Sequence, residues 1–305
     1  MQSYKDLFVG YITNLQDKIT ENLEILDSKE KFIEETWDRV GGGGGRTRVL
    51  SNGRVLEKAG VNISIVHGKL PDSAMNQLKV KEANFFACGI SLVIHPKNPF
   101  VPTVHANFRY FELYNDKQEL VDQWFGGGSD LTPYYYFKAD ATHFHQENKN
   151  VCDQFDLKFY PKFKKACDDY FYNHHRKESR GIGGLFIDYL RPSEKHSMEF
   201  YFNFITSLAD NFLPSYLPIV EKRNKIEYEN NHKNWQELRR GRYVEFNLIH
   251  DKGTLFGLKT GGRIESILMS LPPKVQWTYN FIPKVNSKEE ELIFILTNPI
   301  ILNLK

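Results

Sequence analysis

The chain has 305 residues, of which 40 are basic and 38 acidic, so its formal net charge is +2. This length can bury the core of one large domain, and the balanced charge gives no reason to expect a nucleic-acid partner. No run reaches about 18 apolar residues, so we expect no membrane span. The charged N-terminus lacks the apolar core of a signal peptide, and the three cysteines show no CxxC spacing, which favours a reducing compartment. We therefore expect a cytoplasmic protein.

The start of the chain predicts a helix followed by a glycine-rich loop. Apolar residues recur at helical spacing, which predicts an amphipathic helix over residues 1–37 that packs on the domain. Five glycines, Gly41–Gly45, come next and are followed by Arg46 and Arg48. We expect a mobile loop here, either a plain linker or a lid over an anion, and the adjoining arginines slightly favour the lid.

The rest of the chain predicts a sheet with helices. Residues 84–95 and 101–112 are rich in strand-forming residues and flank a Pro-bounded turn, which predicts a hairpin, and a second glycine loop is expected over 124–137. A helix is predicted at about 140–179, followed by a strand in RGIGGLFIDYL and further helix at about 195–240. After these, RYVEFNLIH and GTLFGL are predicted to form a strand hairpin around DKG. Because the strands cluster and no linker divides the chain, we predict an α+β fold with a mainly antiparallel sheet in a single domain, 1–305.

The second strand of the predicted hairpin carries a row of polar side chains. Alternate residues of a strand share a face, so four hydrogen-bonding residues should point the same way: Thr103, His105, Asn107 and Arg109. If the two strands pair, Ser91 and His95 join the same face. Such groups are not buried without partners, so this is either a solvated sheet face or a binding face. We favour a binding face, because a solvated face normally mixes Lys, Glu and Thr.

The residue types in this row indicate particular chemistry. The planar guanidinium of Arg109 suits a carboxylate or a phosphate, and Asn107 can donate to the same anion. His105 is the only member of the row that ordinarily titrates near neutral pH, so it is the natural proton carrier. Alternatively, histidines could ligate a metal, although their spacing matches no strong ligand pattern. The metal candidates are His95, His105, His145 and His175.

Glycine and arginine recur together elsewhere in the chain. Asp130 follows three glycines and is either a turn or cap residue or a buried acceptor for an N–H-rich ligand, and spacing alone favours the cap. The arginines that lie beside glycines suggest a cradle for an amphiphilic polyanion, the alternative being exposed turns at sheet edges. They are Arg46, Arg48, Arg109, Arg180 and Arg263.

Several long stretches resemble the oxygen-dependent coproporphyrinogen III oxidases, in that family's order. They are EKAGVNISIVHGKLP, HPKNPFVPTVHANFRYFE, WFGGGSDLTPYYYF, HRKESRGIGGLFIDYL and GRYVEFNLIHDKGTLFGLKTGGRIESILMSLPP. The resemblance implies oxidative decarboxylation of two propionates of coproporphyrinogen III to vinyl groups, which gives protoporphyrinogen IX with dioxygen as the oxidant. It also implies a large, flat, mainly antiparallel sheet sandwiched between helices, no organic cofactor, and a homodimer joined by residues 243–277. The tail, 278–305, diverges from the family's usual ending, and the rival function is a non-catalytic tetrapyrrole carrier.

The resemblance also assigns roles to individual residues. His105 matches the presumed proton donor, and Asp130 matches an acid near the pyrrole nitrogens, which reverses its interpretation as a cap. We add Arg180 to the expected substrate-binding residues, and the histidines named above match positions assigned to a divalent metal. Metal-independent chemistry is nevertheless favoured, because the histidine spacing is weak evidence. The matched substrate contacts are Ser91, Asn107, Arg109, Gly261, Gly262 and Arg263.

Overall fold

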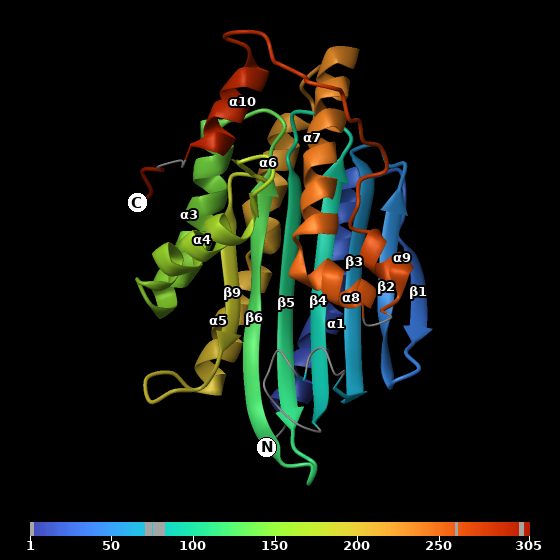
Figure 1. The fold of residues 1–305 in the computed structure, drawn as a ribbon, viewed down its shortest axis with the longest axis vertical. Helices are drawn as coiled ribbons and strands as arrows, with labels where there is room; N and C mark the ends of the chain where they lie inside the picture. The colour runs from blue at the N-terminus through green and yellow to red at the C-terminus, as the bar shows by residue number, and fades with distance from the viewer. Residues whose placement is uncertain (1–2, 71–74, 76–82, 260–261, 299–301) are drawn as a thin grey trace.

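The structure is a computed structural model that describes residues 3–70, 75, 83–259, 262–298 and 302–305 (Figure 1). Its centre is a seven-stranded sheet in the order β1-β2-β3-β4-β5-β6-β9, in which every neighbouring pair is antiparallel. A small second sheet pairs β7 with β8. The strands are β1 (Ile33–Asp38), β2 (Gly43–Ser51), β3 (Leu56–Lys69), β4 (Asn84–Pro96), β5 (Thr103–Tyr114), β6 (Leu120–Thr132), β7 (Tyr172–Asn173), β8 (Glu178–Ser179) and β9 (Gly184–Leu190).

Helices lie on both faces of the large sheet, so the predicted α+β sandwich is confirmed (Figure 1). The helices α1, α5 and α6 cover one face, and α7, α8 and α9 cover part of the other, while α3 and α4 lie beside β9. Among the described residues, no helix is long and apolar enough to cross a membrane. The helices are α1 (Tyr4–Asp27), α3 (Lys138–Phe155), α4 (Phe159–Tyr170), α5 (Met198–Asp210), α6 (Phe212–Arg223), α7 (Asn230–Ile249), α8 (Lys252–Lys259), α9 (Ile264–Leu268) and α10 (Lys288–Thr297).

The sheet face under α1 and α5 belongs to the main hydrophobic core. On β5 the alternate residues that face this side are all buried, as the sequence pattern predicts: Val104, Ala106, Phe108 and Tyr110. Helix α1 adds an apolar stripe at helical spacing, in which Phe8 and Ile12 are fully buried. Because one face of each central strand is buried in this core, the polar side chains lie on the other face.

Two predictions for the start of the chain are wrong. The helix predicted over 1–37 ends at Asp27, and residues 33–38 form the edge strand β1. The glycine run is not a mobile lid, because Gly43–Gly45 open β2 and pair with strands on both sides. A Cβ on Gly45 would lie 2.4 Å from the Trp37 ring, so glycine is needed where this indole crosses the strand.

Later predictions also change. The expected glycine loop over 124–137 belongs mostly to β6, and the helix expected over 140–179 divides into α3 and α4 and ends before β7. The hairpin predicted around DKG is wrong, because RYVEFNLIH ends α7 and GTLFGL lies in α8. Asp251 of DKG accepts from the backbone N–H of Thr254 at 2.7 Å, so it caps a helix.

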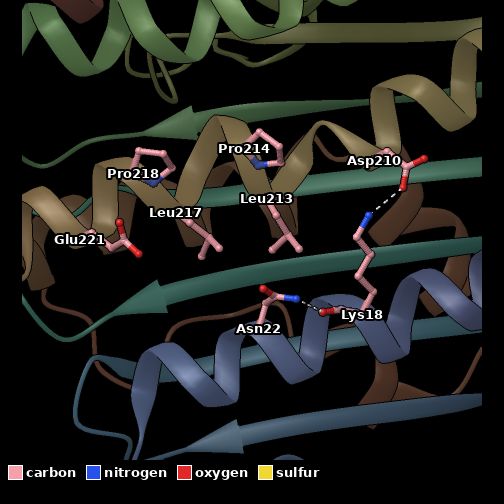
Figure 2. Close-up of a pocket in the computed structure, with 8 residues that line it drawn as sticks. All are labelled: Lys18, Asn22, Asp210, Leu213, Pro214, Leu217, Pro218 and Glu221. Atoms are coloured by element: carbon pink, nitrogen blue, oxygen red, sulfur yellow. Dashed lines mark hydrogen bonds and ion pairs between the residues drawn. The ribbon is translucent and has the colours of Figure 1, made fainter.

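A groove of about 390 Å³ lies between α1 and α6, on the apolar side of the sheet. Figure 2 shows Leu213 and Leu217 of α6 facing α1, and the side chain of Lys18 reaching Asp210 across one end. This ion pair spans 3.3 Å and is half-exposed. The groove therefore offers an apolar floor, and two of its charged residues already pair with each other, so the polar face of the sheet is the better place to seek a site.

Candidate functional site

The polar row on β5 joins polar residues of β4 and β3 on one face of the sheet. Ser91 pairs with Asn107, and Asn62 of β3 pairs with Ser91. Since paired residues of antiparallel strands point to the same side, the predicted common face of Ser91, His105, Asn107 and Arg109 is confirmed. These four side chains are half-buried, so they have neither the burial of core residues nor the exposure of a plain surface.

Strand β6 places Asp130 and two glycines beside the same row. His105 pairs with Asp130, and Arg109 pairs with Gly126. A Cβ on Gly126 would lie 3.1 Å from the guanidinium carbon of Arg109, so the glycine provides the space in which this side chain lies across β6. Gly128 has a φ of 145°, and a Cβ there would meet the backbone of β9. The glycines thus let Arg109 and strand β9 pack closely against β6.

Asp130 is the centre of the site. Its Oδ1 lies 2.8 Å from Nδ1 of His105, and its Oδ2 accepts from Nη2 of Arg180 at 2.7 Å. The side chains of Asp130 and Arg180 are each 2% exposed, whereas His105 is 24% exposed. Burial alone would raise the pKa of Asp130, but the charge of Arg180 and the hydrogen bond with His105 hold it below its ordinary value. Asp130 is therefore a buried, ionised acceptor and not a cap.

The ionised carboxylate fixes the hydrogen-bonding roles of His105. An Asp130 without a proton can only accept, so Nδ1 of His105 must donate to it. In the neutral ring this leaves Nε2 as the acceptor, and no hydrogen bond to Nε2 is found among the described residues. The histidine can thus take up a proton on the nitrogen that does not contact Asp130.

Arg180 lies in a box of aromatic rings behind Asp130. The guanidinium carbon is 4.0 Å from the centre of the Phe171 ring, 4.7 Å from that of Tyr243 and 4.9 Å from that of Phe246. Its Nη1 donates to Oδ1 of Asn247 at 2.8 Å. Rings and an amide thus hold the cation where it can neutralise Asp130. The sequence prediction had Arg180 binding substrate, but here its partners are internal.

Sequence reasoning missed the contributions of Tyr243, Phe246 and Asn247, because the last part of α7, RYVEFNLIH, was predicted as a strand. In the helix, Phe246 and Asn247 follow Tyr243 by three and four residues and so lie on its face of the helix. The helical spacing of Trp235, Arg239 and Tyr243 was a signal that could have located this face. All three of these residues are buried.

Arg109 stands at the open end of the polar row. Its Nη1 donates to Oδ1 of Asn107 at 2.8 Å, and its Nη2 lies 3.0 Å from Oδ1 of Asp188 on β9. The guanidinium also lies 5.7 Å from the centre of the Trp124 ring. Because Asn107 accepts through its oxygen, its NH₂ group is available as a donor. Asp188 is a second residue that sequence reasoning did not single out.

Arg263 lies at the other side of the polar face. Its Nη2 pairs with Glu35 of β1 at 2.5 Å, and its Nη1 donates to Ser266 at 3.0 Å. Ser266 in turn ties α9 to the sheet through Thr47 and Asn62. Glu35 belongs to β1, four strands from β5 in the sheet order, so Arg263 lies on the β1 side of the polar face, whereas Arg109 lies on β5.

The other predicted residues near α9 are only partly described. The backbone N–H of Gly262 donates to the carbonyl of Gly257 at 2.8 Å, which closes the turn before α9. Gly261 lies outside the described residues. Arg46 and Arg48, which were considered for an anion cradle, instead pair with Asp17 of α1 on the apolar side of the sheet, so that interpretation is wrong.

Comparison with known proteins agrees with the geometry. The family model for coproporphyrinogen III oxidase matches residues 8–301. Oxygen-dependent coproporphyrinogen-III oxidase from Drosophila melanogaster is 53% identical over 94% of this chain and 75% of its own length. Coproporphyrinogen-III oxidase 1, chloroplastic, from Arabidopsis thaliana is 48% identical over 97% of this chain and 79% of its own length. The chloroplastic oxygen-dependent coproporphyrinogen-III oxidase from Glycine max is 49% identical, again over 97% of this chain and 79% of its own length.

The chain belongs to the coproporphyrinogen III oxidase family. The match spans every strand of the large sheet, so the polar face, Asp130 and the two flanking arginines all lie within it. The resemblance drawn from the sequence motifs is therefore confirmed. The comparisons do not test the roles of individual residues, which remain predictions argued from the contacts above.

The histidines that the family resemblance matches to a metal do not lie together. His95 is buried, with Nδ1 at 3.1 Å from Thr103 and Nε2 at 2.8 Å from the Ser270 carbonyl. His145 is buried between the Ile182 carbonyl and the Tyr160 hydroxyl, each at 3.0 Å. Burial lowers the pKa of His145 to about 4. Both rings therefore serve as neutral structural links.

The other two members of the set also have separate partners. His175 contacts Glu245 at 2.9 Å and His250 at 3.0 Å. These partners are different residues from Asp130, which His105 contacts. Among the described residues, no three His, Cys, Asp or Glu side chains are placed to hold one metal ion. The four histidines therefore do not fit a shared metal centre.

We expect Asp130→Asn to lower the free energy of unfolding by about 3 kcal/mol at pH 7, because it leaves Arg180 buried without its counter-charge. The pKa of Asp130 is lowered by folding, so its contribution is fully present above the pKa of an unfolded aspartate, about 3.9, and is lost as pH falls through the folded value. The difference between wild type and variant should be constant from about pH 7 to 5 and shrink below about pH 4.

Urea unfolding at these pH values measures the difference. The control is Asp169→Asn, since this carboxylate pairs with Lys165 at the surface and should contribute less than about 0.5 kcal/mol. Equal stability of wild type and Asp130→Asn at pH 7 would contradict the buried ion pair.

Proposed function

We infer that this protein is an oxygen-dependent coproporphyrinogen III oxidase, which converts two propionate groups of coproporphyrinogen III to vinyl groups in haem biosynthesis. Each propionate loses carbon dioxide, one proton and two electrons, and dioxygen accepts the electrons and, with two protons, becomes hydrogen peroxide. The observation that carries this inference is the ionised Asp130–His105 pair on an open polar face flanked by Arg109 and Arg263, in a chain that belongs to the oxidase family.

The polar face suits a flat, apolar macrocycle with carboxylates at its rim. Ser91, His105 and Asn107 lie half-buried on one face of β4 and β5, against which a ring system can lie. We propose that Arg109 and Arg263 bind propionates at opposite sides and that Asn107 and Ser91 donate to the same ligand. Holding the macrocycle at several points fixes the reacting side chain relative to His105, which is how orientation contributes to rate.

We propose that His105 is the catalytic residue that exchanges a proton with the substrate. Its Nδ1–H is held by Asp130, so the opposite nitrogen can accept a proton and return it. Asp130, at 2% exposure, is a positioning residue that orients the ring by accepting from Nδ1–H. Arg180 then keeps Asp130 ionised and does not itself contact substrate. These roles refine the sequence prediction, in which Asp130 met the pyrrole nitrogens directly and Arg180 bound substrate.

Turnover and binding separate the oxidase from a tetrapyrrole carrier. We expect His105→Asn to lower kcat by at least about 100-fold while binding of coproporphyrin III, a non-reacting analogue, changes little. Arg109→Lys should raise KM, because an ammonium cannot form the bidentate fork. Turnover is measured as protoporphyrin formed under air, and binding by fluorescence titration.

The matched control is His143→Asn. This histidine of α3 contacts the Pro214 carbonyl of α6, away from the polar face, so the change should leave both measurements unchanged. If His105→Asn and Asp130→Asn both turn over substrate at the wild-type rate, the catalytic assignment is wrong and the carrier is favoured.

We propose that the reaction uses dioxygen without an organic cofactor, because the electron-rich pyrrole can itself supply electrons. A shared metal centre is not part of the proposal, since the ring nitrogens of His95, His145 and His175 already have internal partners. We expect protein treated with a chelator and then dialysed to keep its kcat, as measured beside its metal content by elemental analysis. Loss of turnover that returns on adding one divalent metal per chain would contradict this expectation.

We further propose a homodimer joined by residues 243–277, and a cytoplasmic location. Several apolar side chains in or beside this segment are exposed in the single chain, including Ile249 at 54%, Ile264 at 58% and Trp277 at 56%. An exposed apolar group of this kind supports a protein–protein interface. The three cysteines are buried free thiols, which supports a reducing compartment.

A further inference from the structure

Arg109 already has an anionic partner before any ligand binds. Its Nη2 lies 3.0 Å from Oδ1 of Asp188, while Nη1 donates to Asn107. The two side chains of the ion pair are 29% and 32% exposed. A pair that solvent reaches is weak and can exchange partners, so a carboxylate from solution can compete for the same guanidinium.

Asp188 reaches Arg109 through an irregularity in β9. Phe125 pairs with Leu190 and Gly127 pairs with Ile187, so two steps along β6 face three steps along β9. The extra residue forms a β-bulge, and bulges redirect neighbouring side chains, often beside active sites. Within it Tyr189 has a φ of 55°, the left-handed region that bulky residues rarely adopt. The backbone that presents Asp188 is therefore strained.

The surroundings support this strained backbone. The Tyr189 ring packs edge-on against Trp124, with ring centres 4.9 Å apart, and the guanidinium of Arg191 lies 4.8 Å from the centre of the Tyr189 ring. Arg191 is fixed in turn by a double hydrogen bond to Asp122. A backbone outlier that is held in place by packing is the kind that serves a site.

We propose that Asp188 is a resident counter-ion of Arg109, which competes with a substrate carboxylate for the guanidinium and so sets substrate affinity. The inference rests on the proposed function in one respect, that Arg109 binds a propionate. A propionate that arrives must displace Asp188 or share the guanidinium with it. The reaction removes two carboxylates from the substrate, and Asp188 supplies a partner to Arg109 whenever the ligand offers none.

The test removes the charge of Asp188 and keeps its shape. In Asp188→Asn we expect coproporphyrin III to bind about fivefold more tightly, with a matching fall in KM for coproporphyrinogen III and kcat within about twofold. Asp188→Glu keeps the charge and should bind as wild type does. In an Arg109→Gln background, Asp188→Asn should have no effect on binding, because the two residues act on the same contact.

The matched control is Asp17→Asn on the opposite face, whose carboxylate is also half-exposed and pairs with Arg46 and Arg48. It should leave coproporphyrin III binding unchanged. Unchanged or weaker binding in Asp188→Asn, or an equal effect when Arg109 is already replaced, would overturn the proposal. Coproporphyrin III is the oxidised analogue, and its binding needs no turnover. If only the oxidase assignment were wrong, no product would form, but the binding differences among these variants would remain.

Discussion

The site depends on one buried carboxylate that stays ionised. Asp130 is almost inaccessible, and burial of a lone charge would raise its pKa and protonate it. Arg180 prevents this at 2.7 Å, held in turn by three aromatic rings and Asn247. With the charge secured, His105 must direct its Nδ1–H inward, and its other nitrogen is left for the substrate. The proposed chemistry at the surface thus follows from an ion pair beneath it.

The fold supplies this arrangement because one face of the sheet packs in the core and the other carries the polar side chains. Alternate residues of β5 pack against α1 and α5 on one side, and the intervening residues form the polar row on the other. Antiparallel register then brings Ser91, Asn107 and Asp130 together from three strands. Arg109 and Arg263 stand at either side of that row, each with an acidic partner from another strand.

The sequence predicted the polar row well because strand alternation is a local property. It could not show that Arg180 turns inward, since that depends on rings contributed by α4 and α7. The last turns of α7 were predicted as a strand because RYVEFNLIH is rich in aromatic and β-branched residues, whereas its buried side follows helical spacing. Gly43–Gly45 were predicted as a loop for their flexibility, but close packing against Trp37 explains them better. The metal set failed because sequence spacing does not reveal that His95 and His145 are hydrogen-bonded within the core.

The most direct test of this account is a crystal structure of the protein with coproporphyrin III. The account predicts that the macrocycle lies on the polar face, with one propionate on Arg109 and the ring within reach of Nε2 of His105. A macrocycle bound instead in the groove between α1 and α6, or propionates that point into solvent away from Arg109 and Arg263, would contradict it.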